Sequence, residues 1–311
     1  MSSLLAFPGQ GAQQPHMLHG LPACNAVQRV LEEASDALHE DVLALDSPQA
    51  LQHSRAVQLC LLVAGVASAR LLLEEGPAPD FVAGLSIGAY GAAVVAGALP
   101  FPDAVRLVAL RGQLMQQAYP EGYGMTAILG LERHQLEALL ARVHSQQTPV
   151  YLANVNAASQ MVVAGSDAAM AALTAEALRA GATGANRLSV TVPSHCELLQ
   201  APAARLAAAF KDVRLQRPGI KYLSATRARP IFDSAQLADD LTYNMCRVVD
   251  WHTTLRTAYE RGVRLHIELL PGTVLTGLAR PVFMQGNAFA FQGTRLDTLR
   301  ALLRREVSKR S

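Results

Sequence analysis

The stretch Val82-Ala-Gly-Leu-Ser-Ile-Gly-Ala-Tyr-Gly91 contains a G-x-S-x-G pentapeptide in which Ser86 stands between two glycines. The apolar residues before it are typical of the end of a buried strand, and the Ala-, Val- and Gly-rich run after it is typical of a tightly packed helix. A serine at such a turn presents its hydroxyl at a helix N-terminus, where free N–H groups can stabilise an oxyanion. The pattern predicts a serine nucleophile, and a capping serine in a glycine-rich turn is the alternative.

Composition restricts the class of protein. The 311 residues suffice for a large domain, alone or with a smaller one. Half of them are apolar and only 5% are aromatic, so the core consists of Ala, Leu and Val and suits helices packed on a sheet. A net charge of +2 without a basic block argues against nucleic-acid binding. The longest apolar run, 59–69, is shorter than a membrane span of roughly 20 residues, so we expect a buried helix and no membrane role.

The cysteines and histidines give further expectations. The four cysteines are scattered without a C-x-x-C pair, which argues against a disulfide framework and favours a reducing cytoplasm. The apolar run at 4–7 is too short for the core of a signal peptide. His16 and His19 could share a helix face, but no third ligand is evident nearby, so we expect surface histidines and no metal site.

Predicted strands and helices alternate along the chain, which indicates an α/β fold. Between residues 124 and 192 the predicted order changes to β–α–β–β–α–β, the split arrangement of ferredoxin-like domains. Its strands are expected at 125–131, 150–156, 160–164 and 186–192, and its helices at 132–144 and 167–180. We therefore predict a large α/β domain from residues 1–123 and 193–311 and an inserted ferredoxin-like small domain from residues 124–192.

Three further residues are candidates for the site. Gln10 lies in a Gly-Gln-Gly loop after the first predicted strand, where the backbone can approach a ligand, although an ordinary turn has the same pattern. Arg111 lies among apolar helix residues and needs an anionic partner, either a substrate or a structural ion pair. His195 follows a predicted strand at the domain junction and is the preferred base among nine histidines. Cys196 is a poor alternative nucleophile because its base would be its own neighbour.

Taken together, these motifs resemble the malonyl-CoA:acyl carrier protein transacylase family. The matches occur in the family's order and cover nearly the whole chain, which makes them far more specific as a set than singly. The resemblance implies an α/β-hydrolase-like large domain with an inserted ferredoxin-like small domain. The matching segments are Phe7-Pro-Gly-Gln-Gly-Ala-Gln13, Gly84-Leu-Ser-Ile-Gly88, Arg111-Gly-Gln-Leu-Met115, Gly124-Met-Thr-Ala-Ile-Leu-Gly130, Val190-Thr-Val-Pro-Ser-His-Cys196 and Glu268-Leu-Leu-Pro-Gly-Thr-Val-Leu-Thr-Gly277.

The resemblance also implies site roles. Ser86 would be the nucleophile and His195 the general base and acid. The backbone amides of Gln10 and Ile87 would form the oxyanion hole, and Arg111 would pair with the free carboxylate of malonyl. Arginine suits that task because its planar fork is permanently charged. The implied activity is an acyltransferase of the ping-pong type, with malonyl-CoA as donor, a phosphopantetheine-type thiol on a carrier protein as acceptor, and no bound cofactor.

Two positions refine this expectation. Asn244 falls where the family uses a main-chain carbonyl to orient the histidine. Leu85 replaces the histidine that most members have before the nucleophile, and we expect it to influence specificity. Leu85, together with Ala89-Tyr90 and the segments 54–58 and 121–126, makes the chain look more similar to the epsilon subunit of malonate decarboxylase than to most of the family. That subunit loads malonyl onto the thiol of a carrier subunit. The chain would then act alone as a monomer or within a complex.

Three other functions remain as alternatives. The first is the ordinary transacylase of fatty-acid or polyketide synthesis, which has the same chemistry and another carrier. The second is a serine esterase, which needs an acid between serine and histidine in chain order. Asp167 lies there, but in the predicted small domain, and an esterase would not need Arg111. The third is a non-catalytic scaffold that docks a carrier protein.

Overall fold

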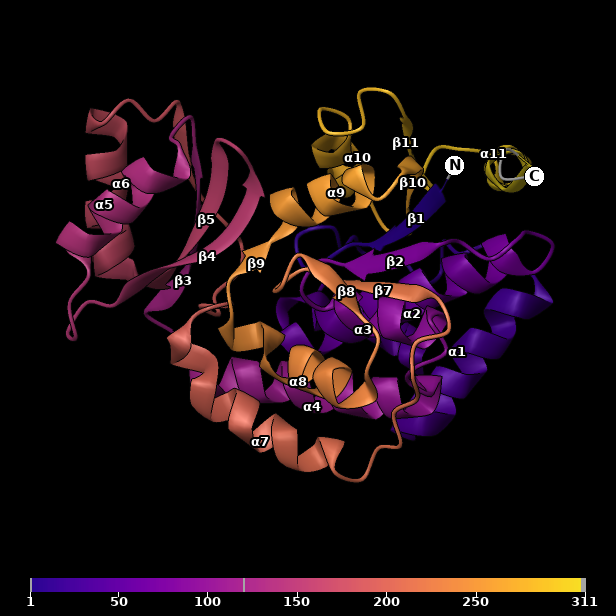
Figure 1. Ribbon diagram of the computed structural model, residues 1–311. Helices are drawn as coiled ribbons and strands as arrows, with labels where there is room; N and C mark the ends of the chain where they lie inside the picture. Colours follow the sequence, from indigo (N-terminus) through magenta and orange to yellow (C-terminus); the bar gives the residue numbers. More distant parts are fainter. Residues whose placement is uncertain (1, 120, 309–311) are drawn as a thin grey trace.

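The computed structural model describes residues 2–119 and 121–308 and contains two β-sheets with helices packed around them (Figure 1). The larger sheet has the strand order β11-β10-β1-β2-β7-β8. Its pairings are parallel except for β7 with β8, which is the pattern of an α/β fold. The strands are β1 Ser2–Phe7, β2 Phe81–Gly84, β7 Lys221–Ser224, β8 Arg229–Ile231, β10 Val263–Glu268 and β11 Asn287–Ala290.

Helices cover both faces of this sheet (Figure 1). Strand β1 shows this directly, because Leu5 and Phe7 lie in one buried apolar cluster while Leu4 and Ala6 lie in another. The first cluster contains residues of α1 to α4, α7, α8 and α11, and the second contains residues of α9 and α10. The helices are α1 Asn25–Leu38, α2 Ser54–Leu73, α3 Gly88–Val95, α4 Phe101–Ala118, α7 Gln200–Phe210, α8 Ser234–Tyr243, α9 Trp251–Glu260, α10 Val274–Ala279 and α11 Leu296–Ser308.

Helix α2 is the expected buried helix. Among the described residues it is the one helix long and apolar enough to cross a membrane, yet 89% of its apolar window is buried inside the protein. It packs against α1, α3 and α4. Helices that are apolar all round occur in protein cores as well as in membranes. The contacts of α2 with its neighbours therefore explain why it is so apolar.

The smaller sheet has the strand order β6-β3-β5-β4-β9. Its first four strands and two helices run β3–α5–β4–β5–α6–β6 along the chain, which confirms the ferredoxin-like arrangement. Strand β9, Val249–Asp250, joins this sheet from a later part of the chain and pairs in parallel with β4. The boundaries at 124 and 192 stay a prediction. The elements are β3 Tyr123–Leu129, α5 Arg133–Val143, β4 Val150–Ala157, β5 Gln160–Ser166, α6 Asp167–Arg179 and β6 Gly184–Arg187.

The predicted fourth strand is present, but the bounds predicted for it, 186–192, are wrong. Strand β6 covers only Gly184–Arg187, because its pairing with β3 ends where Arg187 meets Thr126. Beyond that point Leu188 donates one more backbone hydrogen bond, to the carbonyl of Met125, and the chain leaves the sheet. His195 therefore lies in a loop rather than at the end of a strand.

Candidate active site

The turn between β2 and α3 holds Ser86 in a left-handed backbone conformation, with φ 55°. The turn is fixed to β1 because the Leu85 N–H donates to the carbonyl of Phe7 at 3.0 Å. A Cβ at Gly84 would lie 2.0 Å from the backbone of Gly88, and one at Gly88 would lie 2.2 Å from the Phe7 carbonyl oxygen. Both glycines are therefore required by close backbone approach, and the strained serine conformation is typical of a nucleophile elbow.

His195 lies directly beside this serine. Its Nε2 is 2.8 Å from Ser86 Oγ, and its Nδ1 is 2.6 Å from the main-chain oxygen of Asn244. Because a carbonyl only accepts, Nδ1 carries the proton and Nε2 is free to accept one from the serine. Burial, reinforced by the charge of Arg111, lowers the pKa of His195 to about 4, so the ring is neutral at pH 7.

A short 3-10 helix, Asn244–Cys246, holds the histidine in place. Besides the Asn244 carbonyl, the carbonyl of Met245 accepts a 2.7 Å hydrogen bond from the backbone N–H of His195. His195 itself has φ 63°, which costs strain that these two contacts offset. The family resemblance implied that the main-chain carbonyl at Asn244 orients the histidine. In the structure this carbonyl lies beside Nδ1 of His195.

Arg111 of α4 is fully buried and reaches the same serine. Its Nη2 donates to Ser86 Oγ at 3.3 Å and to Asn244 Oδ1 at 3.1 Å, and its Nη1 donates to Gln58 Oε1 at 2.6 Å. Within residues 2–119 and 121–308 no carboxylate pairs with it, and its Nε is buried without a hydrogen-bond partner. Burial lowers the pKa of Arg111 to about 10, so it stays charged at neutral pH.

A buried cation among neutral partners is expensive unless an anion joins it. Guanidinium has five N–H donors, and the contacts above occupy three of them. The Nε–H is among the donors that have no partner in the described residues. This arrangement favours a substrate carboxylate over the structural ion pair that the sequence left open.

Gln58 is the site residue that sequence reasoning missed. It is fully buried on α2, where it accepts from Arg111 and donates to Gln10 Oε1 at 3.4 Å. The close packing of α2 and α4 makes this contact possible, since a Cβ at Gly112 would lie 2.5 Å from the Cα of Arg55. The sequence did contain a signal for Gln58, because a polar side chain inside an apolar helix requires a buried hydrogen-bond partner.

A cavity of about 100 Å³ lies beside the serine. The larger unit contributes Gln10, Leu85, Ser86 and His195 to its wall, and the smaller sheet contributes residues of β3, β4 and β5. Ile87 follows the serine and its side chain is fully buried. The oxyanion role of the Gln10 and Ile87 amides and the specificity role of Leu85 stay predictions.

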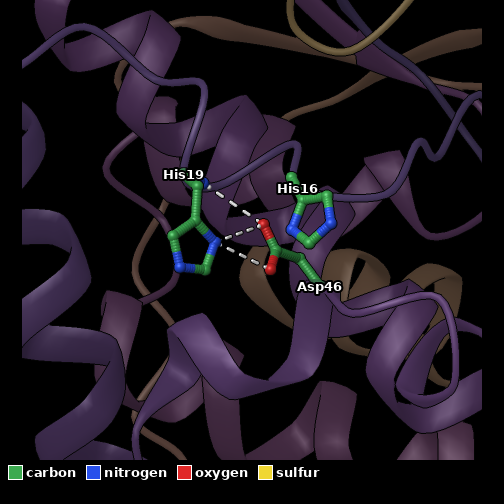
Figure 2. Close-up of side chains that lie close together, drawn as sticks. All are labelled: His16, His19 and Asp46. Carbon is green, nitrogen blue, oxygen red and sulfur yellow. Dashed lines mark hydrogen bonds and ion pairs between the residues drawn. The ribbon is translucent and has the colours of Figure 1, made fainter.

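A second cluster of polar side chains consists of His16, His19 and Asp46 (Figure 2). The buried carboxylate of Asp46 accepts from the backbone N–H groups of Leu18 and His19, and His19 Nδ1 lies 2.9 Å from Asp46 Oδ1. With His16, these ligand atoms lie within 4.8 Å of one another, so among the described residues they form a group that could hold a metal. The 2.9 Å contact fits a direct hydrogen bond better than the separation of about 3.4 Å between two ligands of one tetrahedral zinc.

A serine on a strained strand-to-helix turn, with its proton acceptor in contact and a buried cation beside both, defines the class of serine acyl-transfer enzymes. The model of the acyl transferase domain family matches residues 5–293. The chain therefore belongs to this family and is an acyltransferase.

Known members are similar over nearly their whole length. The malonyl CoA-acyl carrier protein transacylase of Haemophilus influenzae is 36% identical over 285 residues, which are 89% of this chain and 91% of that protein. The solved structure of the transacylase from Coxiella burnetii has 32% identity and a TM-score of 0.92, and the match covers 98% of both chains. A malonyl-transacylase solved in complex with a type II polyketide acyl-carrier protein has 34% identity and the same TM-score, over 97% of this chain and 99% of that one.

Proposed function

We propose that the protein transfers malonyl from malonyl-CoA to the thiol of an acyl carrier protein through a malonyl ester of Ser86. The observation that carries this proposal is Arg111, which is fully buried, lies 3.3 Å from Ser86 Oγ and has no carboxylate partner among the described residues. Malonyl supplies a carboxylate a short distance from its thioester carbonyl. The relatives named malonyl CoA-acyl carrier protein transacylase support the donor, and the solved complex with a carrier protein supports the acceptor.

In the first half-reaction Ser86 Oγ attacks the thioester carbonyl while His195 Nε2 takes the hydroxyl proton. The developing oxyanion accepts hydrogen bonds from the backbone amides of Gln10 and Ile87. The C–S bond then breaks, and the proton on His195 passes to the departing thiolate of CoA. The Asn244 carbonyl, 2.6 Å from Nδ1, stabilises the ring while it carries both protons.

The second half-reaction repeats these steps with another thiol. The carrier thiol gives its proton to His195 and attacks the ester carbonyl of malonyl-Ser86. The C–O bond breaks and the serine recovers its proton. Arg111 holds the malonyl carboxylate throughout, so the acyl group keeps one orientation in both steps. All groups in this route are side chains, backbone atoms or substrates, and it needs no bound cofactor.

The test is the intact mass of the protein after brief exposure to malonyl-CoA, with Ser86→Ala as the control. We expect a malonyl adduct on the wild type and none on the variant. Hydrolysis of the thioester without an adduct would favour the esterase alternative instead. If the protein forms no adduct and does not hydrolyse the thioester, that result would favour the non-catalytic scaffold.

A second candidate concerns the carrier. Leu85 lines the cavity beside Ser86, at the position where most of the family has histidine. This residue favours the epsilon subunit of malonate decarboxylase, whose acceptor thiol lies on a dephospho-CoA-derived group of a carrier subunit. The rate of transfer from malonyl-Ser86 is measured with that carrier and with an ordinary phosphopantetheine carrier. The comparison distinguishes the decarboxylase subunit from the ordinary transacylase. Faster transfer to the ordinary carrier would exclude the decarboxylase assignment.

The compartment and assembly remain expectations. All four cysteines are free thiols, of which Cys60, Cys196 and Cys246 are buried. Free thiols are consistent with a reducing cytoplasm. A carrier protein brings its own thiol arm to the site, so a monomer and a subunit of a larger complex are both compatible with the chemistry.

A further inference from the structure

The cluster of His16, His19 and Asp46 takes no part in the reaction steps above (Figure 2). Both histidines are exposed, whereas Asp46 is only 1% exposed. The backbone N–H groups of Leu18 and His19 donate to its Oδ2 atom, and the ring of His19 donates to its Oδ1 atom. Within residues 2–119 and 121–308 its one ion pair is with His19. A buried carboxylate without Lys or Arg beside it favours the approach of another cation.

The fold supplies the third ligand that the sequence did not show near the two histidines. Asp46 lies 27 positions after His19, at the end of the short 3-10 helix Val42–Asp46. Its main-chain oxygen accepts from the His16 N–H at 2.9 Å, and the Gly20 N–H closes one helical turn onto the His16 carbonyl. Residues three apart on such a turn share one side. Figure 2 shows the result, with the carboxylate of Asp46 between the two imidazole rings.

The spacing of the ligand atoms indicates a coordination geometry. The atoms all lie within 4.8 Å of one another, and His19 Nδ1 is 2.9 Å from Asp46 Oδ1. Metal–ligand bonds of about 2.0–2.1 Å put two ligands at a right angle about 2.9 Å apart, against about 3.4 Å at the tetrahedral angle. The observed distance therefore equals that of adjacent ligands in an octahedral or square-planar site. His16 is exposed, so its side chain is free to turn and complete the set.

The chemistry of the donor set restricts the metal. Imidazole nitrogen suits Zn, Cu, Fe and Ni, whereas Mg²⁺ and Ca²⁺ prefer oxygen ligands throughout. Sites of nitrogen and oxygen ligands at right angles are typical of Cu²⁺ and Ni²⁺, and the 2.9 Å distance argues against tetrahedral zinc. Two imidazoles and one carboxylate fill three positions, and water reaches the others because both rings lie at the surface.

We propose that His16, His19 and Asp46 bind one divalent transition-metal ion, Ni²⁺ or Cu²⁺, with His19 Nδ1 and Asp46 Oδ1 as adjacent ligands. The ion takes the place of the proton between these two atoms, and that proton passes to water. One hydrogen bond is thereby replaced by two coordinate bonds to the same atoms, and His16 supplies the third. The site is independent of the proposed function, because none of these atoms takes part in acyl transfer.

The experiment is calorimetric titration of the tag-free, full-length protein with NiCl₂, in wild type, His16→Ala and His19→Ala. The His16 variant is decisive, because the hydrogen bond between His19 and Asp46 does not involve His16. Circular dichroism establishes that each variant is folded. Absorption of the protein loaded with Co²⁺ reports the geometry, since octahedral Co²⁺ absorbs weakly and tetrahedral Co²⁺ strongly.

His134→Ala is the matched control. His134 is exposed, and its Nδ1 lies 3.3 Å from a carboxylate oxygen of Glu132, so it also offers a histidine beside a carboxylate. This pair belongs to no group of three possible ligands in the part of the chain that the structure describes. It therefore measures how much Ni²⁺ an ordinary surface histidine binds.

We expect wild type and His134→Ala to bind one Ni²⁺ per chain with the same Kd. His16→Ala and His19→Ala should each bind it at least about tenfold more weakly, which corresponds to about 1.4 kcal/mol. A Kd unchanged in His16→Ala would overturn the proposal, because the cluster would then be a hydrogen bond with adventitious surface binding. The absence of Ni²⁺ binding in wild type would overturn it as well, and strong Co²⁺ absorption would overturn the right-angle geometry.

Discussion

The pH dependence of acylation is a direct test of the His195 environment. Burial and the Arg111 charge lower the pKa of this ring to about 4, whereas an exposed histidine titrates near 6.5. At pH 5.5 a ring with the lower pKa is about 97% neutral, and an ordinary one about 9%. The structure therefore predicts that wild type keeps nearly full kcat/KM at pH 5.5, where an exposed base would have lost about tenfold.

The assay is rapid-quench formation of acyl-Ser86 between pH 4 and 9, followed by mass spectrometry. Acetyl-CoA serves as donor in a parallel series, because it lacks the carboxylate that titrates on malonyl. Arg111→Met removes the second cause of the low pKa, so its acid limb with acetyl-CoA should move to higher pH. An acid limb near pH 6.5 in the wild type would refute the reasoning, since it would mean a hydrated His195 or another base.

Stability limits the usable pH range in a predictable direction. Because the pKa of His195 is lower in the folded than in the unfolded chain, the unfolded chain binds more protons between the two values. The stability linked to this ring is complete above pH 6.5 and is lost as the pH falls towards 4, by about 3 kcal/mol. Burial lowers the pKa of His266 to about 3, which acts in the same direction. Fluorescence of the single tryptophan, Trp251, which is buried, shows at which pH values rates refer to folded protein.

Three further substitutions follow from contacts in the site. Arg111→Lys keeps a charge but loses the planar fork, so kcat/KM for malonyl-CoA should fall at least tenfold while acetyl transfer changes little; equal losses with both donors would contradict a carboxylate role. Asn244→Ala keeps the carbonyl that holds the histidine but removes two side-chain contacts, to Arg111 at 3.1 Å and to the main-chain oxygen of Ser86 at 3.3 Å. In steady-state assays KM for malonyl-CoA should therefore rise by a larger factor than kcat falls, and a loss confined to kcat would refute that division. Gly88→Ala places a Cβ 2.2 Å from the Phe7 carbonyl oxygen and should lower the free energy of unfolding by more than about 4 kcal/mol in urea titrations. Its control is Gly277→Ala in α10, where a Cβ has open space and the helix should gain up to about 1 kcal/mol; a similar loss at both positions would contradict the steric argument.

The amino-acid sequence by itself determined the features that depend on neighbours in the chain. The turn around Ser86 follows from glycines whose spacing allows a strand to pass into a helix, and the structure confirms both elements. The apolar run at 59–69 indicated a buried helix, and the structure places it inside α2. The order of strands and helices in the ferredoxin-like unit followed from the same kind of pattern. All of these are local, because sterics and side-chain spacing act over a few residues.

The tertiary structure decided which distant residues meet. Ser86 and His195 are 109 positions apart, and no pattern in either segment contains their 2.8 Å contact. The resemblance implied the Asn244 carbonyl, but the side-chain link from Asn244 to Arg111 depends on how a 3-10 helix lies against α4. The end of β6 and the bulge at Asn154 depend on pairing with partner strands, which overrides the intrinsic preference of a short segment. Long-range packing fixes these contacts, since the free energy of burying Arg111 depends on groups that the chain brings together only when folded.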